Sequence, residues 1–288
     1  MLKKRIIACL VIKNSIVVQS IEFKRFLPIG SPLIAAKFLN QWGIDEITIL
    51  DIDATPTLSS PNFELVKKIS RQIFVPLSVG GGIKNINHIR QIIKGGADKI
   101  IVNTGAFDNP QLISQAAKVI GAQSVVVSVD VKKKNGKWQL FTHCGKIAVK
   151  TDLITWIKQI ENLGAGEILL RSIDRDGSKS GFDTELIKQV TNNVSIPVIA
   201  AGGTGKPNHF LSAIKAGASA VAAGNYFHFT EHSPILIKSY LKSKGVNIRL
   251  DTDANYSHHR INSDGRLLKS PDSYLEDLKF QIIKPEVI

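Results

Sequence analysis

Apolar residues gather in eight short runs along the chain, which recur at intervals of roughly 20 to 40 residues. The runs are rich in β-branched residues and nearly continuous, as is typical of parallel strands covered on both faces. We expect strands at residues 5–12, 46–53, 75–82, 99–104, 124–132, 167–174, 196–203 and 220–227. Helical patterns separate them at residues 31–42, 62–72, 86–95, 109–120, 152–163, 184–191 and 208–216. This alternation within residues 1–250 predicts an α/β fold, a single (β/α)8 TIM barrel.

Local signals sharpen some of these boundaries. Ser31, Ser60, Asp108 and Asp183 stand just before predicted helices, where short polar side chains cap the first turn. In the fifth unit, residues 133–137 contain an Asn-Gly pair, which predicts a tight hairpin turn before residues 138–143.

The chain also repeats itself at a spacing of 121 residues. Residues 46–53 align with 167–174, residues 75–82 with 196–203, and Gly96 with Gly217. Agreement at one spacing across three elements predicts a barrel built from two fused half-barrels. Residues 251–288 lie outside this pattern and form a polar C-terminal extension, which includes the segment 257–260 (Ser-His-His-Arg). We expect these histidines to be solvated rather than to bind a metal, because their spacing is not that of a ligand set.

The charge and the cysteine content limit the classes of function that the chain can have. Lys and Arg number 37 against 24 Asp and Glu, a net charge of +13, which favours anionic partners. The sequence has no nucleic-acid motif, so we expect a phosphorylated small molecule and no nucleic acid. Two cysteines support neither a disulfide framework nor a zinc site. No apolar run approaches the ~20 residues of a membrane span, so we expect a cytoplasmic protein without a membrane partner.

Polar and glycine residues follow four of the predicted strands at the end where a TIM barrel keeps its active site. They form two sets, which are Gly81, Gly82, Asn103 and Thr104, and Gly202, Gly203, Gly224 and Asn225. Glycine lets backbone N–H groups approach a phosphate, although it also serves simple tight turns. Because the sets occur in duplicate, we predict two phosphate cradles and a ligand with a phosphate at each end.

Carboxylates stand at the same strand ends. The candidates for general acid–base chemistry are Asp130 and Asp176; Asp51, Asp53 and Asp174 lie nearby in the sequence. Asp174 and Asp176 could instead serve the turn that follows their strand. At a spacing of 119 residues, Asp130 aligns with Val11, which cannot transfer a proton.

Long ordered motifs at 5–10, 43–46, 50–52, 79–83, 96–99, 164–170, 172–181 and 241–249 resemble the cyclase subunit family of imidazole glycerol phosphate synthase. The resemblance covers residues 1 to about 250. It implies a heterodimer with a glutaminase subunit, no cofactor, and ammonia that crosses the barrel to a bisphosphorylated substrate. It implies an ammonia gate of four residues, Arg5, Glu46, Lys99 and Glu167. Without the resemblance, these four charges would be interpreted as a structural ring of ion pairs. It also implies that Asp98 and Gln123 face the glutaminase.

Three positions depart from the family at its catalytic end. Val11 replaces one aspartate of the catalytic pair, Gln19 replaces a lysine, and Arg171 replaces a threonine; residues 19–28 form a more aromatic and basic loop. This combination resembles the paralogous branch associated with acetamidino modification of surface-polysaccharide sugars. In that branch the barrel supplies ammonia to a sugar amidotransferase. The alternatives are a genuine cyclase of histidine biosynthesis, a non-catalytic scaffold that activates a glutaminase, and a related phosphoribosyl isomerase.

Overall fold

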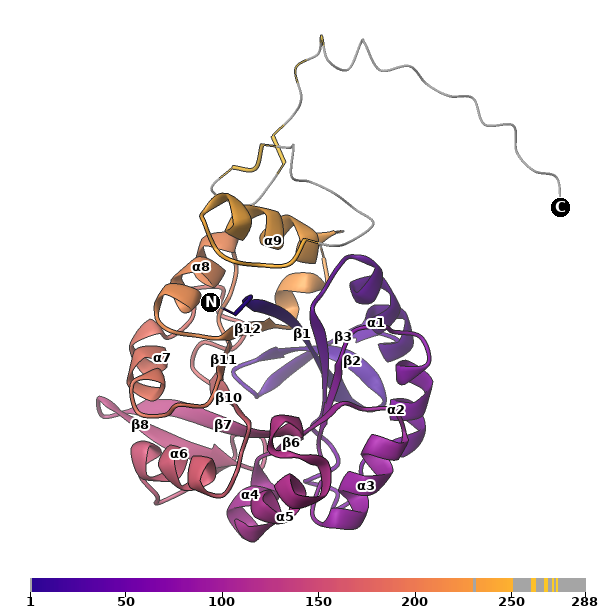
Figure 1. Cartoon of the computed structure of the whole chain (residues 1–288), viewed down its shortest axis with the longest axis vertical. Coiled ribbons are helices and arrows are strands. Elements are labelled where there is room, and N and C mark those ends of the chain that lie inside the picture. Colours follow the sequence, from indigo (N-terminus) through magenta and orange to yellow (C-terminus); the bar gives the residue numbers. More distant parts are fainter. Residues whose placement is uncertain are drawn as a thin grey trace, which may run out of the picture.

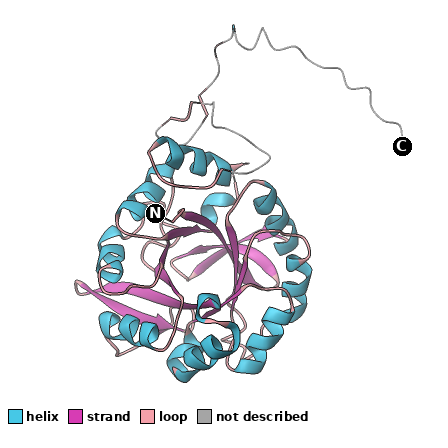
Figure 2. Cartoon of the chain, in the orientation of Figure 1, coloured by secondary structure: helices cyan, strands magenta, loops and turns pink. Residues whose placement is uncertain are grey.

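The computed structural model describes residues 2–229, 232–250, 260–262, 267–268, 271 and 273. Eight parallel strands close into a barrel inside a ring of helices (Figures 1 and 2). In order round the barrel they are β1 (Arg5–Lys13), β4 (Glu46–Asp51), β5 (Leu77–Gly80), β6 (Lys99–Val102), β7 (Val125–Lys134), β10 (Glu167–Ser172), β11 (Val198–Ala201) and β12 (Ala220–Ala223). β12 pairs with β1 and closes the barrel. The predicted TIM barrel is confirmed.

The outer ring consists of α1 (Pro32–Gln41), α2 (Phe63–Ser70), α3 (Ile86–Lys94), α4 (Thr104–Asp108), α5 (Gln111–Ile120), α6 (Leu153–Asn162), α7 (Thr184–Thr191), α8 (Pro207–Lys215) and α9 (Ser233–Ser243). Of the predicted caps, the Asp183 carboxylate accepts the Leu186 N–H at 3.0 Å. Ser31 precedes α1 without a side-chain cap bond. The assignment of Ser60 is wrong, because Asn62 caps α2 and accepts the Leu65 N–H. Asp108 ends α4, and α5 begins after Pro110.

Two hairpins extend from the carboxyl ends of the barrel strands, the end of the barrel that we call its mouth. β7 turns through Asn135 and Gly136, both with positive φ, into β8 (Lys137–Thr142), as the Asn-Gly pair predicted. A short strand β9 (Ile147–Ala148) pairs with β8. The prediction of a loop at residues 19–28 is wrong, because β2 (Ile16–Ile21) and β3 (Arg25–Gly30) form a second hairpin that pairs with β1.

The barrel interior is mainly apolar and partly built from small residues, with a few buried polar side chains that include Thr48, Ser78 and Ser128. Because side chains alternate along a strand, the positions that share the inner face with Arg5 in β1 are 7, 9 and 11. The buried cluster inside the barrel consists of Ile7, Cys9, Leu50, Ile101, Val126, Leu169, Ile199, Ala201, Ala220 and Ala222. A larger cluster fills the space between strands and helices.

A buried ion pair ties α9 to the start of the barrel. Lys238 is 1% exposed, and its ammonium donates to the Gly43 carbonyl at 2.9 Å and to Asp45 at 2.7 Å. The other carboxylate oxygen of Asp45 accepts the Ile6 N–H of β1 at 2.8 Å. This network lies within residues 1–250. The predicted extension, including the segment 257–259, falls almost wholly outside the described residues.

Removing the Lys238 ammonium should destabilise the fold strongly, because a nearly buried carboxylate is then left without its counter-charge. We expect Lys238→Ala to lower the free energy of unfolding by about 3–5 kcal/mol. Lys242→Ala, at an exposed lysine of the same helix, should change it by less than about 0.5 kcal/mol. Urea unfolding followed by circular dichroism measures both, and equal effects would contradict the role of this ion pair.

Candidate active site and axial charge ring

Two cavities open at the carboxyl ends of the strands. The first encloses about 700 Å³, including solvent at its mouth, and lies over the ends of β4, β5, β6 and β7. The second encloses about 1150 Å³ and lies over the ends of β10, β11 and β12. Val11, Ser20 and Arg171 line both cavities and therefore form the wall between them.

The predicted cradle residues are divided between these cavities. Gly81, Gly82, Asn103 and Thr104 line the first, and Gly202, Gly203, Gly224 and Asn225 line the second. A Cβ on Gly81 or Gly203 would meet the carbonyl oxygen of Asp51 or Gly181, and both glycines have positive φ. Glycine is thus required by the turn itself, so phosphate binding stays a prediction at these positions.

The two asparagines of the cradles differ in what they offer a ligand. The side-chain amide atoms of Asn103 are buried and make no hydrogen bond within 3.5 Å in the described part of the chain, but Asn103 is near enough to Asp130 to help lower the pKa of that carboxyl. Asn225 accepts the Ser20 N–H at 3.2 Å and donates to the Ser20 carbonyl at 2.8 Å. Asn225 therefore holds the β2–β3 hairpin against the end of β12, a use that its position in the sequence did not indicate.

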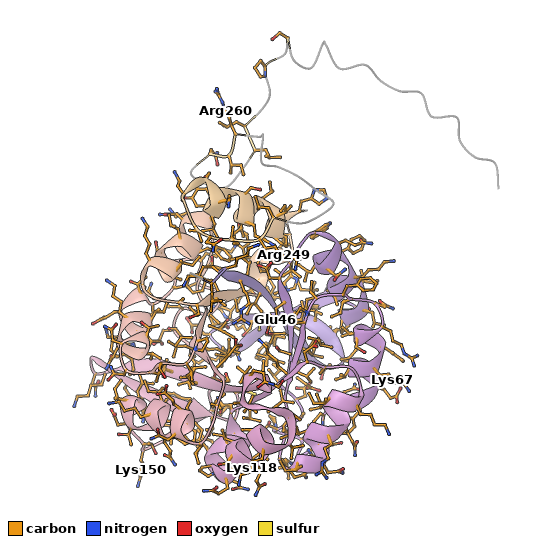
Figure 3. The ribbon with its side chains drawn as sticks, viewed as in Figure 1. Glu46, Lys67, Lys118, Lys150, Arg249 and Arg260 are labelled. Carbon is orange, nitrogen blue, oxygen red and sulfur yellow. The ribbon has the colours of Figure 1, made fainter. Side chains whose placement is uncertain are left out.

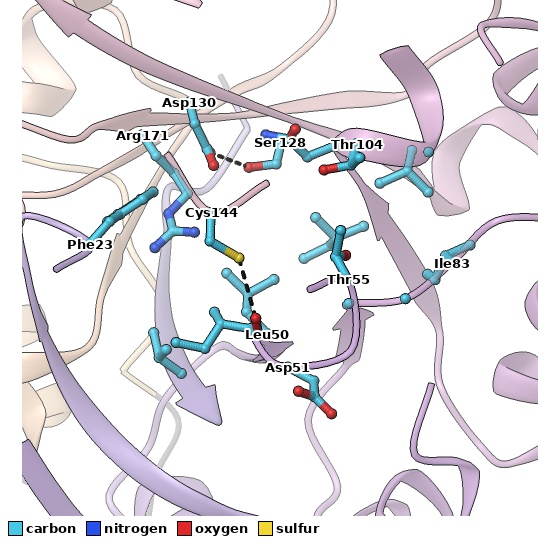
Figure 4. A pocket seen from close by; sticks show the side chains of 18 of the residues that line it. Phe23, Leu50, Asp51, Thr55, Ile83, Thr104, Ser128, Asp130, Cys144 and Arg171 are labelled. Carbon is cyan, nitrogen blue, oxygen red and sulfur yellow. Dashed lines mark hydrogen bonds between the residues drawn. The ribbon is translucent and has the colours of Figure 1, made fainter. Parts of the chain in front are cut away.

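Asp130 projects from β7 into the first cavity (Figure 4). Its carboxylate is 4% exposed and accepts the Ser128 hydroxyl at 2.8 Å. Burial raises the pKa of Asp130, and the nearby Arg171 charge and the Ser128 hydrogen bond only partly offset this effect. A carboxyl held in this way is suited to proton transfer rather than to stabilising the fold.

Asp176 lies in the second cavity and is bound to the hairpin. It accepts the Ser20 hydroxyl, and its carboxylate lies 3.4 Å from the Phe23 N–H. Burial raises the pKa of Asp176, against the opposing effects of Arg171 and Ser20. The structure thus brings Asp176 to the site, as predicted, and also gives it a structural task there.

The other carboxylates mostly serve local structure. Asp51 lines the first cavity and accepts the N–H groups of Asp53 and Ala54, and burial raises its pKa. Asp53 forms an ion pair with Lys13 at 3.0 Å. Asp174 accepts the Lys133 N–H at 2.7 Å and so binds the backbone of β7, not the turn that follows its own strand.

Arg171 occupies the centre of the mouth. Its guanidinium stacks on the Phe23 ring of the hairpin at 4.2 Å and lines both cavities; Figure 4 shows it among the residues of the first. Burial opposes its charge, but Asp130 and Asp176 more than offset this, so its pKa is raised. Gln19 does not line either cavity; it pairs with Leu27 within the hairpin. The Phe23 contact was not visible in the sequence, because it depends on how the hairpin folds over β10.

The opposite end of the barrel is closed by four charges. Arg5 donates to Glu46 at 2.8 Å and to Glu167 at 2.5 Å, and Lys99 donates to the same two glutamates at 3.1 and 2.9 Å. Glu46 lies at the centre of the barrel in Figure 3, whereas Lys67 and Lys118 lie on the outer rim. The Ser78 hydroxyl donates to Glu46 at 2.6 Å and was not found from the sequence. The predicted four residues therefore form one alternating ring across the axis.

The face around this ring carries apolar residues. Phe74 is 94% and Leu2 is 89% exposed, and both precede a barrel strand. Asp98 lines a surface depression together with Phe74, and its carboxylate accepts the Leu77 N–H at 2.8 Å. Gln123 is exposed on the 3-10 turn η1 (Ala122–Ser124) before β7. Exposed apolar side chains at this end of the barrel make it a candidate interaction surface.

A family described as "Histidine biosynthesis protein" matches residues 5–233. The chain is 44% identical over 267 residues to a Vibrio vulnificus (strain YJ016) protein that carries the provisional name imidazole glycerol phosphate synthase subunit hisF2, covering 92% of this chain and 98% of that protein. It is 45% identical to the imidazole glycerol phosphate synthase subunit HisF of Thermococcus onnurineus (strain NA1) and 46% to that of Thermotoga sp. (strain RQ2). Each of these two matches covers 251 residues, 87% of this chain and 99% or more of the relative.

These matches identify a TIM-barrel protein of the histidine biosynthesis class. Within that class, the chain belongs to the HisF-like family of imidazole glycerol phosphate synthase cyclase subunits. In the part of the chain that the structure describes, no helix has the length and apolar character needed to cross a membrane.

The raised pKa of Asp130 gives a pH-dependent prediction. Ionising this carboxyl in the folded chain is unfavourable, so Asp130→Asn should raise the free energy of unfolding at pH 7. The gain should shrink as the pH falls through the raised pKa and vanish below the ordinary carboxyl pKa of about 3.9, where Asp130 is protonated in both states. Denaturant unfolding at several pH values measures this difference. Asp108→Asn, at an exposed position, is the matched control, and an equal gain there would count against our account.

Proposed function

We propose that this chain is an ammonia-channelling synthase subunit that works with a glutaminase subunit and supplies ammonia for acetamidino modification of a surface-polysaccharide sugar. The observation that carries the proposal is the contrast between the two ends of the barrel. The charge ring of Arg5, Glu46, Lys99 and Glu167 is complete, whereas at the mouth Val11 takes the position on β1 that would pair with Asp130.

The barrel axis is chemically suited to a neutral small molecule. Above the ring, the inner face is mainly apolar and includes Cys9, Ala201 and Ala222; the buried residues Thr48 and Ser128 add two uncharged hydroxyls to it. Such a lining favours neutral ammonia over the ammonium ion, because transfer of an unpaired charge from water into an apolar space is costly. The ring would admit ammonia when one of its ion pairs opens, and we expect Lys99 to be the member that moves, because its ammonium is a compact point charge on a flexible stem and lacks the rigid fork of Arg5.

The mouth lacks the pair of groups that cyclisation would need. Val11 is 6% exposed and lines both cavities beside Arg171. Asp130 therefore has no second carboxylate across the β1 side of the mouth, and a positioned acid or base contributes about 10²–10⁴-fold in rate. We infer that ammonia passes on from here to a separate sugar amidotransferase.

The C-terminal extension also supports the proposal. The Vibrio vulnificus match covers 92% of the 288 residues, more than residues 1–250 contain, so it includes part of the extension. The HisF matches cover 87% of the chain and nearly all of each relative. The extension is thus shared, at least in part, with a protein named hisF2.

A genuine cyclase subunit of histidine biosynthesis is the second candidate, favoured by 45% identity over the whole of a HisF subunit. Turnover of the bisphosphorylated ribulosyl intermediate by the purified chain with saturating ammonium salt separates the two. We expect no measurable turnover. A rate within about tenfold of ~10 s⁻¹ would favour the cyclase and overturn our proposal. Any turnover would also exclude a purely non-catalytic scaffold.

Restoring the missing carboxylate tests whether Val11 is what limits cyclisation. Val11→Asp should raise cyclase turnover in that ammonium-dependent assay to at least tenfold above the detection limit, because it supplies the second group of the acid–base pair. Val18→Asp, in the strand that pairs with Val11, controls for a carboxylate placed merely nearby. Unchanged turnover in Val11→Asp would show that Arg171 or another departure is limiting.

The ring gives a test of the conduit. In a complex with its glutaminase and the sugar amidotransferase, Lys99→Ala should alter glutamine-dependent amidination of the sugar at least severalfold. It should spare amidination with ammonium salt, because that ammonia reaches the mouth from solvent. Lys67→Ala, on the outer rim, should change neither. Equal loss of both activities in Lys99→Ala would place Lys99 outside the conduit.

A further inference from the structure

Arg171 is a cation without a direct partner. Its guanidinium has five N–H donors, yet it makes no hydrogen bond and no ion pair within 4.0 Å with any residue that the structure describes. It stacks instead on the Phe23 ring at 4.2 Å. A largely enclosed arginine normally has its donors satisfied. Its N–H groups are therefore available to an anion that enters the mouth.

The charged residues that line the two cavities indicate which cavity favours an anion. The first cavity is lined by Asp51 and Asp130 as well as Arg171, so its lining carries a net charge of −1. The second is lined by Asp176, Arg171 and Lys179, a net charge of +1. The Asp176 carboxylate is also already engaged by the Ser20 hydroxyl. An anionic group is thus favoured in the second cavity.

A phosphate cradle lies next to Arg171 in the same cavity. Arg171 is the register partner of Ala201, and Gly202 and Gly203 follow directly on β11. The glycine turn and Arg171 thus lie on adjacent strands, which are about 4.8 Å apart, and both line the second cavity. α8 begins shortly afterwards at Pro207, and its N-terminal dipole favours negative charge at this turn.

We propose that the second cavity binds a small phosphorylated carboxylic acid, whose phosphate lies at Gly202–Thr204 and whose carboxylate is held by Arg171. The planar guanidinium fork matches a carboxylate with two parallel hydrogen bonds, and stacking on Phe23 fixes its orientation. Arg171 is then the residue that selects for a carboxylate. This inference rests on the phosphate cradle of the proposed function but not on the reaction.

Calorimetric titration of the full chain with three probes tests the assignment. The probes are 3-phosphoglycerate, glycerol 3-phosphate, which lacks the carboxylate, and glycerate, which lacks the phosphate. We expect 3-phosphoglycerate to bind at least tenfold more tightly than glycerol 3-phosphate. Arg171→Thr should reduce that ratio to about one, and Arg171→Lys should leave an intermediate ratio because lysine keeps the charge without the fork.

Arg90→Thr, at an exposed arginine of α3, makes the same change of charge and should keep the full ratio. Circular dichroism at the titration temperature confirms that each variant is folded. Equal affinities for the first two probes, a ratio that survives Arg171→Thr, or no binding of 3-phosphoglycerate or glycerate at millimolar concentration would overturn the proposal. Arg171-dependent binding of glycerate without binding of glycerol 3-phosphate would retain the carboxylate site and remove the phosphate cradle alone.

Discussion

Charged side chains inside a closed barrel must find their partners within it, because the surrounding strands and helices separate the interior from bulk water. At the amino end of the barrel this requirement is met completely. Arg5 and Lys99 each contact both Glu46 and Glu167, so every charge of the ring has two neighbours of opposite sign. The ring can close the axis without leaving any of its four charges unpaired.

The mouth meets the same requirement incompletely. Asp130 and Asp176 are buried enough for their pKa values to rise, and Arg171 lies between them without a direct ion pair in the described structure. The β2–β3 hairpin supplies what the barrel does not, through the Phe23 ring over Arg171 and the Ser20 hydroxyl on Asp176. The hairpin is thus part of the site rather than a cover added to it.

The sequence located the strand ends but not the use of the groups placed there. The eight strands, the ring and the distribution of glycines followed from periodicity, repeat spacing and resemblance. Asn225 was also predicted as a cradle residue, yet its side-chain amide is already hydrogen-bonded to the Ser20 backbone. Such assignments depend on the path of the hairpin, which the aromatic and basic character of residues 19–28 did not reveal. The helix α9 was also missed, although Lys238 within it secures Asp45.

The ring and the mouth sit on the same strands but at opposite ends. In β1, Arg5 belongs to one and Val11 to the other, and six residues of extended chain separate them by about 20 Å. Substitutions over that distance act nearly independently. Substitutions can therefore change the chemistry of the mouth while the ring at the other end is kept, and the same separation makes this barrel a suitable scaffold for new reactions at its mouth.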